Sequence, residues 1–232
     1  MVEVLAHRGA SKAARANTIE AFRLAGAVGS DAVELDVRRT SDGVLVIHHD
    51  PHVADGRVIV DVLAADLPDY VPHLHAALDA CRGMWVNVEI KNDPEEPDFD
   101  PTDSIADRTI AALVERKQDD RWLVSSFRLE TIDRCKAVAG TIRTAWLVNE
   151  IPDDVIATMV GRGHEALHPW VANLRRSHID VCHGAGIEVN TWTCDDPQRM
   201  VELIEWGIDG ICTNVPDVAL AVIAGTYAVV EG

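Results

Sequence analysis

The chain contains eight short apolar segments of similar character. They are rich in Val, Ile, Leu and Trp and do not alternate strictly between apolar and polar residues. Such segments are typical of strands that are covered by helices. The predicted strands are Val2–Ala6, Ala32–Val37, Trp85–Ile90, Trp122–Ser125, Thr141–Trp146, Ala166–His168, Ile187–Trp192 and Gly210–Cys212.

Longer amphipathic segments separate these strands. Several of them begin at Asp, Ser or Pro and end close to a Gly, which are ordinary start and stop signals of helices, and Asn17 is a good N-cap for the first. The predicted helices are Thr18–Val28, His73–Cys81, Thr102–Lys117, Leu129–Ala139, Asp153–Val160, Ser177–Ala185, Pro197–Trp206 and Pro216–Ile223. Strand–helix units that repeat eight times predict an α/β fold, a closed (β/α)8 TIM barrel.

The second strand–helix unit is longer than the others. Gly43–His48 and Val58–Val62 each read as an extra extended piece within it. We interpret 38–83 as including a small insertion, a rim or lid that is too short for a domain of its own, and we expect residues 1–232 to form a single domain. A second irregular segment, Asp93–Asp103, is rich in proline and acidic residues and is predicted to be a solvated loop.

Composition narrows the choice of partners. Apolar residues make up 47% of the chain and charged residues 25%, as in ordinary globular proteins, and the net charge is −17. An acidic chain gains nothing from releasing the counterions of nucleic acid, and an anionic membrane surface repels it. A negatively charged substrate would therefore need a metal ion or a focused cluster of Arg and Lys.

The cysteines and the N-terminus bear on location. The chain has 5 cysteines, an odd number at irregular spacing, which indicates reduced thiols. We see neither a basic segment followed by a long apolar run at the start nor about 20 consecutive uncharged apolar residues anywhere. We therefore expect a cytoplasmic protein without stable membrane association, and its oligomeric state stays open.

Three acidic residues lie on neighbouring predicted strands. Glu34 and Asp36 are two residues apart, so their side chains point to the same side of the strand, and Glu89 lies on the next main strand. Interior carboxylates are costly without a partner, and oxygen ligands suit a hard ion such as Mg²⁺ or Ca²⁺. The alternative is that these acids form ion pairs with Arg8, Arg38 or Lys91.

Two histidines follow predicted extended segments. Barrel enzymes place their sites at the C-terminal ends of the strands, where His7 and His49 are found. Because histidine titrates near neutrality, one could accept a proton while the other donates one. His48 and His49 are adjacent on an extended segment, so only one of them can face the site.

The same strand ends carry candidates for substrate binding. Arg8 and Lys91 would supply the local positive field that an acidic protein needs to hold an anion. Trp192, at the end of the seventh predicted strand, is either a wall of the substrate site or plain packing.

Short motifs in a fixed order span almost the whole chain. They are Ala6-His7-Arg8-Gly9, Asn17-Thr18, Glu34-Leu35-Asp36-Val37, Thr40-Ser41-Asp42-Gly43, His49-Asp50-Pro51, Val88-Glu89-Ile90-Lys91 and Gly207-Ile208-Asp209-Gly210-Ile211-Cys212-Thr213-Asn214. Taken together, the set resembles the glycerophosphodiester phosphodiesterase family, and the order and spacing of the motifs make the resemblance specific.

The resemblance implies a barrel with a short insertion after its second strand. It also implies that His7 and His49 are the acid–base pair, that the three acids bind a divalent ion, and that Arg8 and Lys91 contact the phosphate. Two positions depart from the family pattern. Arg15-Ala16 stands where the family usually has Pro-Glu, and Asn214 stands where it often has Asp. Neither departure touches the two histidines or the three acids.

The activity that we expect is metal-dependent hydrolysis of a small glycerophosphodiester to glycerol 3-phosphate and an alcohol. The resemblance suggests a cyclic 1,2-phosphate intermediate, whereas the residues alone also permit direct attack by water. Two alternatives stay open. One is a phosphodiesterase of the lysophospholipase D type, and the other is a phosphate-ligand binding protein that has lost turnover. The sequence leaves the headgroup and the identity of the ion undetermined.

Overall fold

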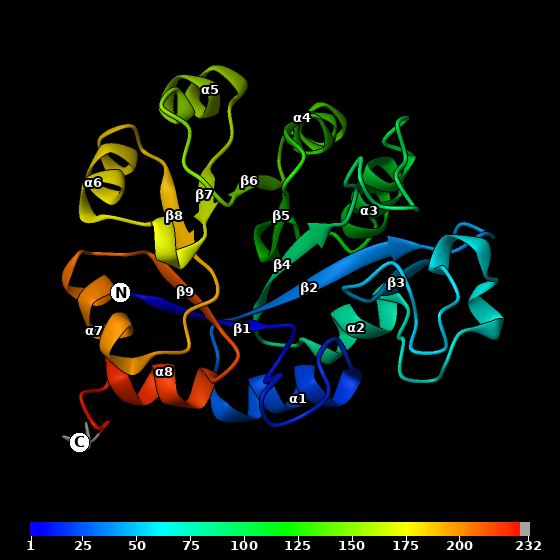
Figure 1. The fold of residues 1–232 in the computed structure, drawn as a ribbon, viewed down its shortest axis with the longest axis horizontal. Helices are drawn as coiled ribbons and strands as arrows, with labels where there is room; N and C mark the ends of the chain where they lie inside the picture. The colour runs from blue at the N-terminus through cyan, green and yellow to red at the C-terminus, as the bar shows by residue number, and fades with distance from the viewer. Residues whose placement is uncertain (228–232) are drawn as a thin grey trace.

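The structure is a computed structural model that describes residues 1–227. Within this range eight parallel strands form a barrel, and helices surround it (Figure 1). The barrel is closed because β1 pairs with β2 on one side and with β9 on the other. The strands are β1 (Glu3–His7), β2 (Ala32–Arg39), β4 (Trp85–Ile90), β5 (Trp122–Ser126), β6 (Arg143–Val148), β7 (Ala166–Pro169), β8 (Glu188–Thr191) and β9 (Gly210–Thr213). The predicted (β/α)8 TIM barrel is confirmed.

A helix follows each barrel strand, close to the range that the sequence predicts. The helices are α1 (Ile19–Val28), α2 (Leu74–Ala80), α3 (Ser104–Val114), α4 (Leu129–Val138), α5 (Val155–Arg162), α6 (Arg176–Gly184), α7 (Pro197–Glu205) and α8 (Pro216–Ile223). The N-cap of α1 is Thr18, whose hydroxyl accepts from the Ala21 N–H, and not Asn17 as predicted. Asn17 instead has a φ of 60° and directs its side chain to Asp36.

The insertion after β2 projects from the side of the barrel (Figure 1). Its first extended piece is β3 (Leu45–Ile47), which pairs antiparallel with β2 as predicted. The second predicted piece, Val58–Val62, is wrong, since it contains the 3-10 turn η1 (Ile59–Asp61). Ile59 is buried there in a small cluster with Val46 and Val53, so its apolar character reflects packing and not strand pairing.

Three further short turns complete the secondary structure. They are η2 (Ala64–Asp66), η3 (Asp119–Arg121) and η4 (Val171–Asn173). The described residues contain no helix whose length and apolar character would let it cross a membrane. All five cysteines are buried and free, as expected for reduced thiols.

The acidic loop after β4 is only partly solvated, which corrects the expectation for Asp93–Asp103. Asp98, Asp100 and Asp103 are buried. Asp98 and Asp103 pair with the arginines Arg38 and Arg128. Asp100 accepts hydrogen bonds from the Ile105 N–H and the Ser104 hydroxyl at the start of α3. The loop is therefore fixed to the barrel by its acids, because buried carboxylates are tolerated when they are paired or hydrogen-bonded.

The two faces of each barrel strand have different partners. Val33 and Leu35 of β2 are buried in the outer core that the helices cover, together with Phe22 of α1. Glu34 and Asp36 alternate with them and therefore face the barrel interior. The polar residues of β2 that face the interior thus lie toward the C-terminal end of the strand.

Candidate active site

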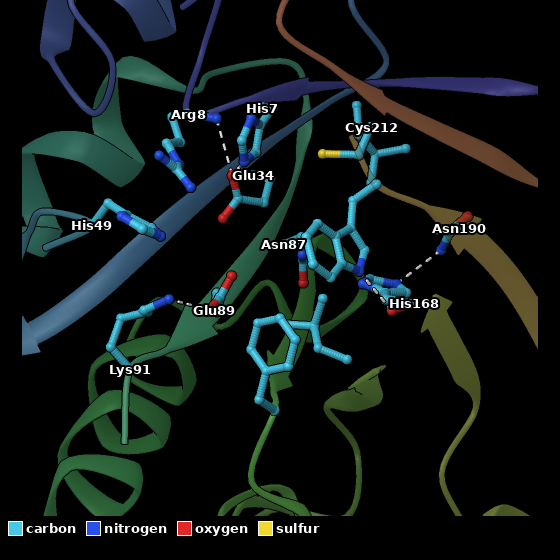
Figure 2. A pocket seen from close by; sticks show the side chains of 14 residues that line it. His7, Arg8, Glu34, His49, Asn87, Glu89, Lys91, His168, Asn190 and Cys212 are labelled. Atoms are coloured by element: carbon cyan, nitrogen blue, oxygen red, sulfur yellow. Dashed lines mark hydrogen bonds and ion pairs between the residues drawn. The ribbon is translucent and has the colours of Figure 1, made fainter. Parts of the chain in front are cut away.

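A cavity of about 190 Å³ opens at the C-terminal ends of the barrel strands. Its wall is formed by side chains that are far apart in the sequence and that Figure 2 shows pointing toward one another. Of the predicted site residues, all but Asp36 line it, and Asp36 lies beside Glu89 in the strand register. These lining residues are His7, Arg8, Glu34, His49, Glu89, Lys91 and Trp192.

The three predicted acids form one buried cluster. The strand register places Glu34 beside His7 and Asp36 beside Glu89, and one oxygen atom of each acid lies within 4.8 Å of the others. Glu34 Oε1 and Asp36 Oδ1 are buried and have no hydrogen-bond partner among the described residues. These carboxylate oxygens, close together and partly unpaired, have the chemistry and spacing to hold a hard divalent ion.

The charges around the cluster are unequal. Burial and the neighbouring Asp36 and Glu89 carboxylates raise the pKa of Glu34 well above its usual value. Burial alone would raise the pKa of Asp36 too, but Lys91 and Arg8 outweigh it and lower that pKa to about 2. Arg8 Nε lies 3.2 Å from Asp36, and Lys91 Nζ lies 2.8 Å from Glu89. The acids are thus partly paired, and Glu34 is the one that lacks a lysine or arginine side chain.

His7 ends β1 and is held from two sides. Its Nδ1 lies 2.7 Å from Asn214 Oδ1, and its Nε2 lies 3.9 Å from Glu34 Oε2. Burial, together with the charge of Arg8, lowers the pKa of His7 to about 4. The imidazole is therefore neutral near pH 7 in this environment and directs Nε2 to the acid cluster.

His49 approaches the cavity from the loop after β3. Its Nδ1 lies 2.6 Å from Asp50 Oδ1, and its side chain is 40% exposed. His48 instead directs Nδ1 to the Asp50 carbonyl and does not line the cavity, so one histidine of the pair faces the site, as predicted. Figure 2 shows His49 and His7 on the same side of the cavity as Glu34.

A sharp turn after β1 positions Arg8. Arg8 has a φ of 57° and Gly9 a φ of 82°, and the Arg8 N–H donates to Glu34 Oε2 at 3.0 Å. A Cβ on Gly9 would lie 2.6 Å from the backbone of Ala21, so a side chain there would force α1 away. The glycine therefore lets the arginine reach the acid cluster while α1 stays packed.

Trp192 packs against its neighbours and also borders the cavity. Its indole Nε1 donates to the His168 carbonyl at 2.8 Å, and its ring meets Phe127 edge-on with centroids 5.4 Å apart. It also lines the cavity. The aromatic pair forms part of the cavity wall.

Several lining residues were missed by sequence reasoning. Asn87 lies two residues before Glu89 on β4 and faces the same side, so the period of the strand contained the signal. His168 and Asn190 are buried at the far end of the cavity, with His168 Nε2 3.1 Å from the Asn190 amide. Nothing in the sequence distinguishes His168 from a core histidine.

These observations define a class of protein, a TIM barrel with acids, histidines and cations gathered in one cavity at the C-terminal ends of its strands. The model of the glycerophosphoryl diester phosphodiesterase family matches residues 7–218. A glycerophosphodiester phosphodiesterase of Caldanaerobacter subterraneus is 28% identical in an alignment of 241 positions. The alignment covers 92% of this chain and 94% of that protein. The chain therefore belongs to the glycerophosphoryl diester phosphodiesterase family, and the resemblance seen in its motifs is confirmed.

Solved structures agree with this assignment. A phosphodiesterase of Oleispira antarctica in complex with the product sn-glycerol-3-phosphate has a TM-score of 0.84 and 26% identity, and the match covers 96% of each chain. A glycerophosphodiester phosphodiesterase of Agrobacterium tumefaciens has a TM-score of 0.79 and 26% identity, and the match covers 97% of this chain and 100% of that one. The similarity thus extends over the whole barrel.

Arg38 binds the backbone of His49 and forms no ion pair with Glu34, Asp36 or Glu89. Its guanidinium is fully buried, pairs with Glu96 at 2.8 Å and Asp98 at 2.6 Å, and donates from Nε to the His49 carbonyl at 2.8 Å. One arginine therefore joins β2, the acidic loop and the backbone of a candidate catalytic residue.

We predict that Arg38→Met lowers the free energy of unfolding by about 3–5 kcal/mol, because removing one member of a buried ion pair leaves the other uncompensated. Urea unfolding followed by circular dichroism measures this. The matched control is Arg39→Met, since Arg39 is partly exposed and lies 3.7 Å from Asp100, so its loss should cost no more than about 1 kcal/mol. Equal midpoints for the two variants would contradict the structural role of Arg38.

Proposed function

We propose that this protein hydrolyses small glycerophosphodiesters to glycerol 3-phosphate and an alcohol, with residues 1–232 acting as one catalytic domain. The observation that carries the proposal is the buried trio of Glu34, Asp36 and Glu89, with His7 and His49 beside it in one cavity. The family match and the product complex of the Oleispira antarctica relative support the choice of substrate.

A divalent ion fits the acid cluster. Glu34, Asp36 and Glu89 would hold it, and Glu34 Oε1 and Asp36 Oδ1, which accept no hydrogen bond from the described residues, are available to it. An all-oxygen ligand set favours Mg²⁺ or Ca²⁺ over softer metals. When bound, such an ion supplies a Lewis acid that polarises a phosphoryl oxygen and offsets the charge that develops on it.

The two histidines divide the proton transfers. His7 is partly buried and its pKa is lowered to about 4, so its Nε2 can accept the proton of the attacking oxygen. His49 lines the same cavity with its Nδ1 held by the Asp50 carboxylate, and in this proposal it protonates the departing alcohol. In the direct route the attacking oxygen is that of water. In the cyclic route it is a glycerol hydroxyl, and a second step follows in which water opens the cyclic phosphate. The histidines exchange roles in that step, since His49 accepts the proton of water and His7 returns its proton to the glycerol oxygen.

The cationic side chains hold the phosphate. Arg8 and Lys91 both face the cavity. Arg8 contacts Asp36 and Lys91 contacts Glu89, and these ion pairs hold the two cationic side chains in place while they bind an anion. In a chain of net charge −17, this local field is what admits an anionic substrate. Trp192 and Phe127 then form the wall along which the uncharged part of the substrate lies.

The other two candidate functions are less well supported. A lysophospholipid needs a broad apolar surface beside the cavity, and the large apolar side chains that are exposed among the described residues are scattered over separate elements. Both histidines line one cavity, and the Nδ1 atom of each is held by a neighbouring side chain. A binding protein without turnover would not need this arrangement. Hydrolysis of a water-soluble diester accounts for more of the site.

We predict that His7→Ala and His49→Ala each lower kcat for glycerophosphocholine by about 10²–10⁴-fold, the usual contribution of an acid–base group. Glycerol 3-phosphate release with Mg²⁺, Ca²⁺ or Mn²⁺ present in turn is the measurement, with lysophosphatidylcholine as the competing substrate. His52→Ala is the control, because His52 is exposed and does not line the cavity. Near-normal turnover in both cavity variants would refute the assignment, and preferential cleavage of the lysolipid would favour that alternative.

We also predict that Mg²⁺ or Ca²⁺ raises the Tm of the protein and that EDTA abolishes activity. An ion at about a hundred times its Kd stabilises the folded state by about 2.7 kcal/mol. Glu34→Gln combined with Asp36→Asn should remove this shift, because the ligands lose their charge. Glu95→Gln combined with Asp93→Asn, two exposed acids outside the cluster, should keep it. Full activity in EDTA would count against the metal site.

A further inference from the structure

A chain of polar contacts leads from His7 to the surface across the seam of the barrel. Asn214 follows β9, and β9 pairs with β1, so Asn214 lies beside His7. Asn214 Oδ1 is 2.7 Å from His7 Nδ1, and Asn214 Nδ2 is 2.7 Å from Asp195 Oδ2. Asp195 in turn accepts from the Thr213 hydroxyl at 2.9 Å and from the Asn214 N–H at 2.8 Å.

The direction of each hydrogen bond in this chain is determined by Asp195. A carboxylate can only accept, so the amide group of Asn214 must turn its Nδ2 donor to Asp195. The Oδ1 acceptor must then face His7, where the Ser11 hydroxyl also donates to it at 2.8 Å. His7 Nδ1 must therefore carry the hydrogen, and Nε2 keeps a lone pair directed to the cavity.

We infer that Asn214 and Asp195 are positioning residues that fix the tautomer of His7, so that Nε2 is the atom that accepts a proton from the attacking oxygen. The inference rests on the proposed function, because it specifies how the proposed base is prepared. It also gives a physical reason for asparagine at position 214. An aspartate there would place two carboxylates at hydrogen-bonding distance from one another, unless Asp195 changed as well.

An isosteric exchange tests the direction of the hydrogen bonds and leaves the shape unchanged. In Asp195→Asn, the new carbonyl oxygen must accept from Thr213 and from the Asn214 N–H, so the new NH₂ group faces Asn214 Nδ2. Two donors cannot pair, and Asn214 is expected to rotate its amide and present NH₂ to His7. His7 would then accept at Nδ1 and carry its hydrogen on Nε2, which is the wrong tautomer for a base.

The second variant reverses this effect. In Asp195→Asn combined with Asn214→Asp, the carboxylate at position 214 accepts from both His7 and the new amide at position 195, which restores the hydrogen on Nδ1. We expect Asp195→Asn to lower kcat for glycerophosphocholine by roughly 10²-fold with little change in KM. The kcat of the double variant should be at least about tenfold higher than that of Asp195→Asn. A merely structural contact would not be rescued by exchanging the two groups.

Spectroscopy gives a readout that is independent of turnover. The ¹⁵N resonances of His7, assigned by their absence in His7→Gln, should report an Nδ1–H tautomer in the wild-type protein and the double variant and an Nε2–H tautomer in Asp195→Asn. Asp196→Asn is the matched control, because Asp196 caps α7 and does not contact Asn214. It should leave both readouts unchanged.

The outcomes separate the two levels of the argument. Wild-type kcat and tautomer in Asp195→Asn, or a double variant no more active than the single one, would overturn the inference while leaving the proposed function intact. Activity that survives His7→Ala would instead overturn the proposed role of His7. A Tm within about 1 °C of wild type in every variant, measured alongside, shows that the fold is not the cause.

Discussion

The mutual repulsion of three buried carboxylates determines the arrangement of the barrel mouth. Strand periodicity puts Glu34 and Asp36 on one side of β2, and the register of β2 and β4 puts Glu89 beside Asp36. In a site of low dielectric constant, three ionised carboxylates so close together cost free energy unless positive charge lies beside them. Arg8 and Lys91 supply two charges, yet burial and the two other carboxylates still raise the pKa of Glu34. A divalent ion, as proposed for this site, would add positive charge where Glu34 has no lysine or arginine side chain beside it.

The placement of arginine follows from the same constraint. The chain is strongly acidic, and its buried acids outside the mouth have arginines of their own, as Asp98 has Arg38 and Asp103 has Arg128. Because Asp98 and Asp103 already have arginine partners, these two acids do not compete for Arg8 and Lys91 at the cavity. The pair formed by Arg38 also fixes the His49 backbone, so the same interaction stabilises the loop and aligns a candidate catalytic residue. Stability and site geometry therefore depend on shared contacts.

Local periodicity was enough to predict the barrel and its acid cluster, because both depend on which side of a strand a residue faces. The same reasoning assigned Val58–Val62 to an extended piece, since it cannot tell an apolar residue that pairs in a sheet from one such as Ile59 that fills a small core. It also left Asp98 in solvent, because its partner is 60 residues away in the sequence. Long-range pairing between side chains is decided by the fold and leaves no local pattern.

The two histidines differ in a way that only the three-dimensional arrangement reveals. His49 faces a charged acceptor, Asp50, near the surface, whereas the partly buried His7 faces a neutral amide. A carboxylate stabilises an imidazolium, and an amide fixes the ring without adding charge. An aspartate at position 214 would give both rings the same kind of partner and reduce the difference between them. Asn214, with Asp195 behind it, orients the ring of His7, whereas burial and the charge of Arg8 lower the pKa of that ring. The contacts of the two rings therefore differ in the way that the proposed division of proton transfers needs.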